Sequence, residues 1–132
     1  MSTENMMSIV DPQEYSKAEE EAAQSAGVYV HTFQPPFSYC GKTYDKLTFR
    51  FDQLTGADSL AVEDELQALG KAVIVPIFSG QYLTRISARA CQERIDFMAF
   101  KAMPIRDYNQ IRSHARSFFL ASELWRGTEE SG

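Results

Sequence analysis

Residues 37–51 have the sequence FSYCGKTYDKLTFRF, and this stretch decides how the chain folds. In its second half, large apolar side chains alternate with polar ones, as on one face of a β-strand: Leu47, Phe49 and Phe51. Glycine accepts the positive φ of the first central position in a type II′ turn, and Gly41-Lys42 offers that position. The stretch predicts a β-hairpin from Phe37 to Phe51. A lone hairpin is marginal in water, so its apolar face must pack against helices.

Helix signals follow the hairpin. Thr55 and Asp58 have the spacing of a capping box and predict a helix through Leu69, with Gly70 as its stop. Its buried stripe is expected to contain three residues: Val62, Leu66 and Leu69. A short apolar connector at 72–78 separates this helix from the next.

Two more capping residues predict two more helices. Ser79 can cap a helix whose apolar residues follow the 3.6-residue period: Leu83, Ile86 and Ala90. Asp96 can cap a short helix from Phe97 to Met103, which ends before Pro104.

The strongest amphipathic pattern lies in the last predicted helix. Pro104 suits its first position, because proline has the helical φ and needs no N–H there. The residues at helical spacing on its inner face are Tyr108, Ile111, Ala115, Phe118, Phe119 and Ser122. Gly127 is expected to end the helix, and residues 127–132 are expected to form a frayed C-terminus.

We therefore predict a mostly α (α+β) fold, an N-terminal β-hairpin followed by three to four packed helices. One globular domain is expected at 35–126, where Pro35-Pro36 opens the ordered part. Residues 1–34 are predicted to form an acidic flexible tail, because few large apolar side chains occur there. The net charge of the whole chain is −5, and residues 1–26 carry six acids and one base.

Charge is also uneven within the predicted domain. The stretch 52–65 is acidic, whereas 85–116 holds seven bases against three acids. Two such segments could meet in the fold or face different partners. Phosphate binding needs clustered positive charge, but the pI near 5.0 opposes a nucleic-acid partner. We expect Arg85 and Arg89 to lie on a solvated helix face.

No catalytic or metal-binding pattern is found. The seven glycines form no phosphate-binding loop, and Gly41-Lys42-Thr43 is predicted to be a hairpin turn. Cys40 and Cys91 are read as free thiols, and neither His31 nor His114 has a predictable carboxylate partner. We expect no enzyme, cofactor or metal. The longest apolar run has seven residues, which is too short for a membrane span, so a cytoplasmic protein is expected.

The order of these features resembles the tail assembly chaperones of tailed bacteriophages and prophages. Their opening, a Gly-Lys hairpin, a strand and an acidic capped helix, is similar to 41–50 and 54–58. A Tyr-containing helix with alanines, a short helix before proline, and a closing helix with a Phe-Leu pair are similar to 82–91, 97–104 and 107–120. The resemblance covers about residues 36–122.

The resemblance implies a function in virus assembly. The protein would bind the tape measure protein, keep it soluble and help recruit tail tube protein, in the cytoplasm of the bacterial host and outside the mature virion. We assign partner contact to five large apolar residues: Phe97, Phe100, Phe119, Leu124 and Trp125. Trp125 lies where burial is hard, and tryptophan often anchors a partner, although a core position is equally consistent with the pattern.

Three alternatives remain open from the sequence. The chain could be a structural or minor tail component of the phage, which would stay in purified particles. It could instead be a small helical regulatory domain that binds DNA through its arginine-rich helices. An exposed hairpin edge also allows pairing with a second copy of the chain.

Overall fold

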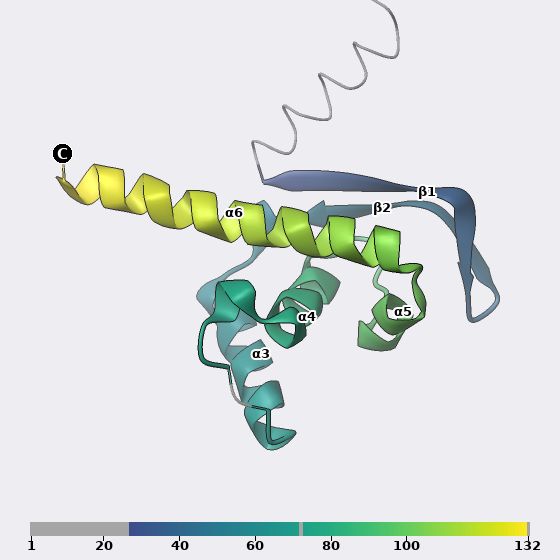
Figure 1. Cartoon of the computed structure of the whole chain (residues 1–132), viewed down its shortest axis with the longest axis horizontal. Coiled ribbons are helices and arrows are strands. Elements are labelled where there is room, and N and C mark those ends of the chain that lie inside the picture. Colours follow the sequence, from purple (N-terminus) through teal and green to yellow (C-terminus); the bar gives the residue numbers. More distant parts are fainter. Residues whose placement is uncertain (1–26, 72, 132) are drawn as a thin grey trace, which may run out of the picture.

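A computed structural model describes residues 27–71 and 73–131, with side chains as far as Ser122. A two-stranded hairpin comes first and helices follow, so the predicted α+β fold class is confirmed (Figure 1). The elements in order are β1 (Val28–Tyr39), β2 (Lys42–Arg50), the 3₁₀ turn η1 (Phe51–Gln53), α3 (Gly56–Ala68), the 3₁₀ turn η2 (Pro76–Phe78), α4 (Gly80–Ala90), α5 (Phe97–Ala102) and α6 (Ile105–Ser131).

The first strand begins earlier than predicted. β1 pairs with β2 in antiparallel register from Val28 opposite Arg50 to Tyr39 opposite Lys42. Residues 28–34 therefore belong to the hairpin, and the prediction of a tail over them is wrong, while residues 1–26 lie outside the described part. The two prolines at 35–36 fall within a register shift between Thr32 and Phe37. Proline has no N–H for the ladder, so the pair interrupts the pairing without ending the strand.

The hairpin turn also differs from the expected one. Its two central residues are Cys40 and Gly41, since the strands end at Tyr39 and resume at Lys42. Both have positive φ, 51° for Cys40 and 80° for Gly41. Two positive φ values are the mark of a type I′ turn, so the type II′ prediction is wrong. Glycine occupies the second central position rather than the first.

One face of the hairpin packs on the helices and forms much of the core. Leu47 and Phe49 are fully buried, and Phe51 is 2% exposed, as the alternation predicts. α4 lies at the centre of the helical layer and contacts α3, α5, α6 and β2. Its predicted stripe is confirmed, since its apolar residues are buried: Leu83, Ile86 and Ala90. The structure thus has a hairpin on one side and α4 as the buried centre of the helices.

The predicted caps of three helices hold. The Asp58 carboxylate accepts hydrogen bonds from the Thr55 N–H at 2.8 Å and from its hydroxyl at 3.2 Å. The Ser79 hydroxyl oxygen accepts from Tyr82 N–H at 3.1 Å, and the Asp96 carboxylate accepts from Ala99 N–H at 3.0 Å. These bonds satisfy N–H groups that have no partner within their own helix.

Two details of helix packing are corrected. Val62 and Leu66 are buried on α3, but Leu69 is 54% exposed. Leu69 is the C-cap residue, where the chain leaves the helical path and the stripe no longer faces the core. α6 continues through Gly127 to Ser131, so the predicted helix end and frayed 127–132 segment are wrong up to Ser131. A single glycine costs a helix about 1 kcal/mol and ends it only if the chain turns there.

α6 is the longest helix and runs alongside the strands of the hairpin (Figure 1). It contacts both β1 and α4, so it ties the sheet to the helical layer. Ile111 and Ala115 of its predicted stripe are buried, whereas Tyr108, Phe118 and Phe119 are half-buried and Ser122 is exposed. Among the described residues, none of the helices is long and apolar enough to cross a membrane.

The acidic and basic segments meet in the fold. Arg89 Nε on α4 donates to Asp58 Oδ1 on α3 at 2.8 Å. Arg85 Nη1 lies 3.7 Å from Glu65 Oε2 on the same two helices. The prediction of a solvated face is wrong for Arg85, which is 6% exposed, and right for Arg89. Arg89 therefore joins α4 to α3 by a hydrogen bond, and Arg85 lies buried at a longer distance from α3.

Candidate partner-binding groove

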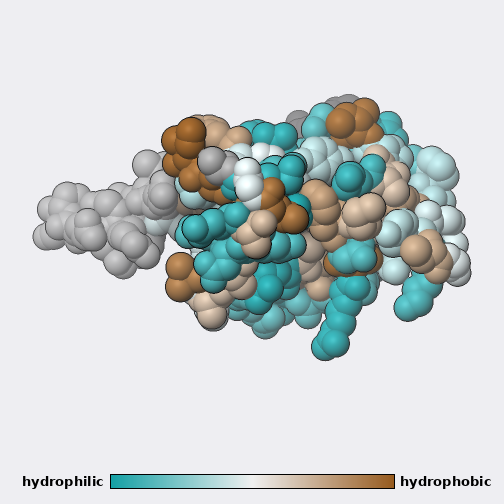
Figure 2. All heavy atoms as spheres, turned by 90° about the horizontal axis from the view of Figure 1, so that it is seen from below, coloured by the Kyte–Doolittle hydropathy of each residue, from teal (hydrophilic) through white to brown (hydrophobic). Residues whose placement is uncertain are grey.

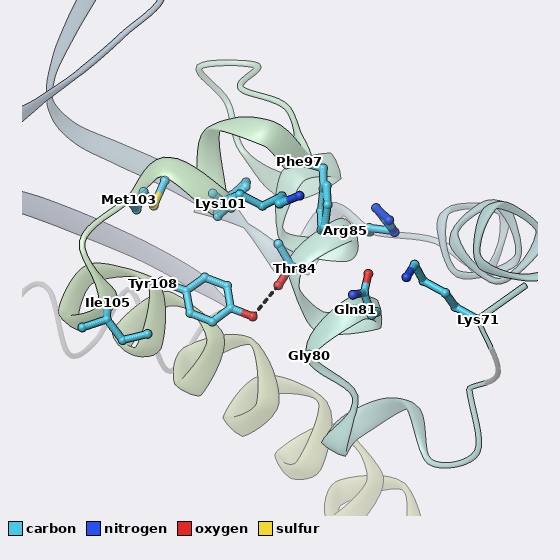
Figure 3. Close-up of a pocket in the computed structure, with 11 residues that line it drawn as sticks. Lys71, Gly80, Gln81, Thr84, Arg85, Phe97, Lys101, Met103, Ile105 and Tyr108 are labelled. Carbon is cyan, nitrogen blue, oxygen red and sulfur yellow. Dashed lines mark hydrogen bonds between the residues drawn. The ribbon is translucent and has the colours of Figure 1, made fainter. Parts of the chain in front are cut away.

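A groove of about 700 Å³ lies between α4, α5 and the first turn of α6 (Figure 3). α5 is only six residues long and ends at Ala102, and the next residue, Met103, lines the groove. The lining residues are Lys71, Gly80, Gln81, Thr84, Arg85, Phe97, Phe100, Lys101, Met103, Ile105 and Tyr108. We refer to this set as the groove.

The apolar side of the groove comes from α5 and the start of α6. Phe100 and Met103 are nearly fully buried, at 2% and 7% exposure, and Phe97 is half-buried. Ile105, by contrast, is 70% exposed, although it is a large aliphatic residue. Burying a side chain of this size is worth about 2 kcal/mol, so Ile105 offers that amount to an incoming apolar group. Buried apolar side chains therefore form the floor of the groove, and the exposed Ile105 lies at its edge.

A hydrogen bond fixes one wall of the groove. The hydroxyl groups of Thr84 on α4 and Tyr108 on α6 lie 2.9 Å apart (Figure 3). This bond holds the first turns of α6 against α4 and satisfies both polar groups. The wall is consequently built from two rigid helices.

Basic side chains occupy the other side of the groove. The Arg85 guanidinium lies over the Phe97 ring, 3.8 Å from its centre, and Lys101 Nζ lies 5.9 Å from the same ring centre. Such cation–π contacts are worth about 1 kcal/mol, and more where water is excluded. Lys71 extends toward Gln81 from the opposite side (Figure 3). The groove thus combines an apolar floor with a positively charged edge.

A second hollow, of about 530 Å³, adjoins the groove and shares Lys71 with it. It is lined by Glu63, Gln67, Gly70, Lys71, Val73, Ile74 and Pro76. Ile74 within it is 89% exposed. Seen from below, the surface carries separate apolar patches among hydrophilic residues (Figure 2). The groove and this hollow together leave apolar side chains without a partner.

Of the five sequence-predicted contact residues, the structure describes the side chains of Phe97, Phe100 and Phe119. Phe97 and Phe100 line the groove. Phe119 packs inward, with its ring centre 6.3 Å from Tyr82 and 5.2 Å from Phe118. The side chains of Leu124 and Trp125 lie outside the described residues. The sequence pointed to Phe97 and Phe100 of α5 as contact residues but not to the lysines and Arg85 that line the groove with them.

A buried polar cluster links β1 to α6, and no pattern in the sequence indicates its pairing. His31 Nε2 is hydrogen-bonded to Asp107 Oδ1 at 2.8 Å, and His31 Nδ1 is hydrogen-bonded to the Tyr29 hydroxyl at 2.7 Å. Both ring nitrogens of this buried histidine therefore have a partner. The Tyr29 ring also stacks on His114, with centres 3.7 Å apart.

His31 thus has a carboxylate partner that the sequence could not predict. His31 and Asp107 are 1% and 5% exposed, and neither lines the groove or the second hollow. The alternation of Tyr29, His31 and Phe33 and the spacing from Asp107 to Ile111 place all these residues on inner faces. Those periodicities could have suggested burial, but only the fold sets the strand beside the helix.

The pKa shifts in the described region agree with this burial. Desolvation lowers the pKa of His114, and the nearby His31 lowers it further. Burial raises the pKa of the Cys91 thiol to about 11. Cys40 is exposed and Cys91 buried, both as free thiols, as predicted. Within 27–71 and 73–131, no three His, Cys, Asp or Glu residues gather as a metal site would require.

Comparisons of the whole chain with protein-family models, with curated proteins and with solved structures find no match. Any function of the groove must therefore be inferred from the residues that line it.

Proposed function

We propose that this chain is a tail assembly chaperone of a tailed bacteriophage, which binds apolar segments of the tape measure protein and keeps that protein soluble. In this function it also helps to recruit tail tube protein and leaves before the virion is complete. One observation carries the proposal: an open groove with an apolar floor, flanked by the exposed Ile105 and Ile74. A chaperone needs such a surface before its partner arrives.

The shape of the surface favours a protein segment as its occupant. An amphipathic helix binds a groove through apolar side chains on one face, three and four residues apart. The groove and the second hollow share Lys71 in their linings, so an extended segment reaches both where a compact molecule would fill only one. The residue order shared with tail assembly chaperones supports the tape measure protein as that occupant.

Charges near the groove favour binding that is fast and reversible. Lys71 and Lys101 are exposed at its edge, while Glu63 is exposed beside the second hollow. Charged edges speed encounter and add little to the lifetime of a complex. An assembly factor that must leave its partner benefits from this balance.

The test is co-expression with the tape measure protein and the tail tube protein encoded by the same phage. We expect the tape measure protein to be soluble and to co-purify with the tagged chain, and to aggregate without it. Purified particles should lack the chain. A tape measure protein that is equally insoluble in both cultures would refute the proposal, and a chain retained in particles would identify a structural component instead.

A further inference from the structure

Arg85 is a buried cation whose charge is incompletely matched. Its side chain is 6% exposed, and its Nε atom has no hydrogen-bond partner among the described residues. The nearest carboxylate oxygen, Glu65 Oε2, lies 3.7 Å from Nη1, and Glu65 itself is half exposed. A strong charge-assisted hydrogen bond is shorter, at about 2.8 Å. Burying a charge without such a bond is costly, so Arg85 can still gain from an added acceptor.

Two lysines line the same groove as Arg85. Figure 3 shows Lys101 on one side of the Phe97 ring and the Arg85 guanidinium on the other, while Lys71 points toward Gln81. All three cations line the groove, and no carboxylate is among its lining residues. The apolar floor lies directly beside them, with Phe97 as the shared boundary. The groove therefore offers positive charge and apolar contact within one site.

We propose that the groove selects a partner segment in which a carboxylate lies beside apolar side chains. The carboxylate lies at the edge lined by Arg85, Lys71 and Lys101, and the apolar side chains cover Ile105, which is exposed close to the buried Met103. This inference rests on the proposed function and adds the chemistry by which a segment of the tape measure protein would be chosen. It predicts an Asp or Glu next to the apolar positions that enter the groove.

A carboxylate on a protein segment fits this site better than the phosphates of a nucleic acid. Phosphate backbones bind extended positive surfaces, and their affinity grows with each neutralised phosphate. Here the three cations stand at the edge of an apolar floor and form no extended positive surface. A single carboxylate beside apolar side chains matches both parts of this lining.

The test uses fluorescent amphipathic helical peptides of about 18 residues that differ only in Glu or Gln beside the apolar positions. We expect the wild-type chain to bind the Glu peptide about tenfold more tightly than the Gln peptide in fluorescence anisotropy. The double variant Lys71→Gln/Lys101→Gln should lose this preference, and Arg85→Met should lose it as well. Both lysines are exposed, so their substitution leaves the core intact even if Arg85→Met fails to fold.

The matched control is Lys42→Gln/Lys46→Gln, which makes the same charge change on exposed residues of the hairpin. This control should keep the full preference. Equal binding of both peptides to the wild-type chain, or equal loss in both double variants, would overturn the proposal. So would competition by duplex DNA that depends on Lys71 and Lys101, or self-association that these lysines abolish.

Co-expression separates this inference from the proposed function. If the wild-type chain and Lys71→Gln/Lys101→Gln both keep the tape measure protein soluble, the result supports the chaperone function and contradicts the proposed preference for a carboxylate. If neither chain keeps the tape measure protein soluble but the wild-type chain still prefers the Glu peptide, the result supports the carboxylate preference and contradicts the chaperone function.

Discussion

At the residue scale, His31 has the largest structural consequence. It joins β1 to α6 through Asp107, across 76 positions of sequence, and it is also hydrogen-bonded to Tyr29. All of this occurs in the buried interior, where an unmatched polar group costs the most. The cluster fixes how α6 lies on the hairpin, and with it the first turn of α6 at the edge of the groove.

Substitution His31→Leu tests this link. It leaves the Asp107 carboxylate buried without its partner, and we expect the free energy of unfolding to fall by about 3 kcal/mol in urea titrations. The double variant His31→Leu/Asp107→Leu should lose clearly less than the two single variants together, because it removes both polar groups. Additive losses would mean that the pair contributes no coupling.

The two cysteines give a second residue-scale prediction. Only the thiolate reacts with iodoacetamide, and a pKa of about 11 leaves Cys91 as thiolate in about one molecule per thousand at pH 8. We expect mass spectrometry of the native chain to show alkylation at exposed Cys40 and none at Cys91. Cys40→Ser should then remain unmodified until urea is added. Rapid labelling of Cys91 in the native chain would contradict its burial.

At the element scale, capping and the contacts between helices determine where the helices sit. Asp58 serves both purposes, because it caps α3 through Thr55 and holds Arg89 of α4. The capping pattern could be predicted from sequence, since its two residues are three positions apart. The bond to Arg89 could not, because it joins residues 31 positions apart.

Asp58 makes stability depend on acid. The Thr55 N–H lowers the pKa of Asp58 below its ordinary 3.8, and Arg89 lowers it further. Its stabilisation is therefore complete above pH 3.8 and is lost as the pH falls through the lower pKa of the folded state. We expect Asp58→Asn to cost about 1 kcal/mol at pH 7 and to weaken the acid dependence below pH 4 in urea titrations.

The matched control for this prediction is Asp64→Asn, which removes an exposed carboxylate from the same helix. It should unfold with acid as the wild-type chain does. An unchanged acid dependence in Asp58→Asn would show that the cap and the Arg89 bond contribute nothing below pH 4.

At the scale of the whole molecule, the groove is the open space that a short α5 leaves between longer helices. Its lining comes from α4, α5, α6 and the connector that holds Lys71. Large apolar residues stay exposed at its border, where folding alone would favour burial. Such exposure is expected where a partner completes the surface.

The double variant Ile74→Ser/Ile105→Ser tests that interpretation. Both residues are exposed and line the two hollows, so the free energy of unfolding should change by less than about 0.5 kcal/mol. Soluble tape measure protein in the co-expression culture should fall severalfold. The control Leu60→Ser/Leu120→Ser changes exposed residues that line neither hollow and should leave the yield unchanged. Equal yields from both variants would exclude the hollows as the partner surface.

The sequence by itself determined the local structure of this protein. The alternation of apolar and polar residues determined the apolar face of β2, and the capping residues Thr55, Ser79 and Asp96 determined where three helices begin. Both signals are local, because they involve residues close together in the chain. Only the tertiary structure decided which turn closes the hairpin, that β1 continues through Pro35-Pro36, and that His31 meets Asp107. It also buried Arg85 beside Lys71 and Lys101. These features depend on pairing and packing between distant segments, which no local pattern contains.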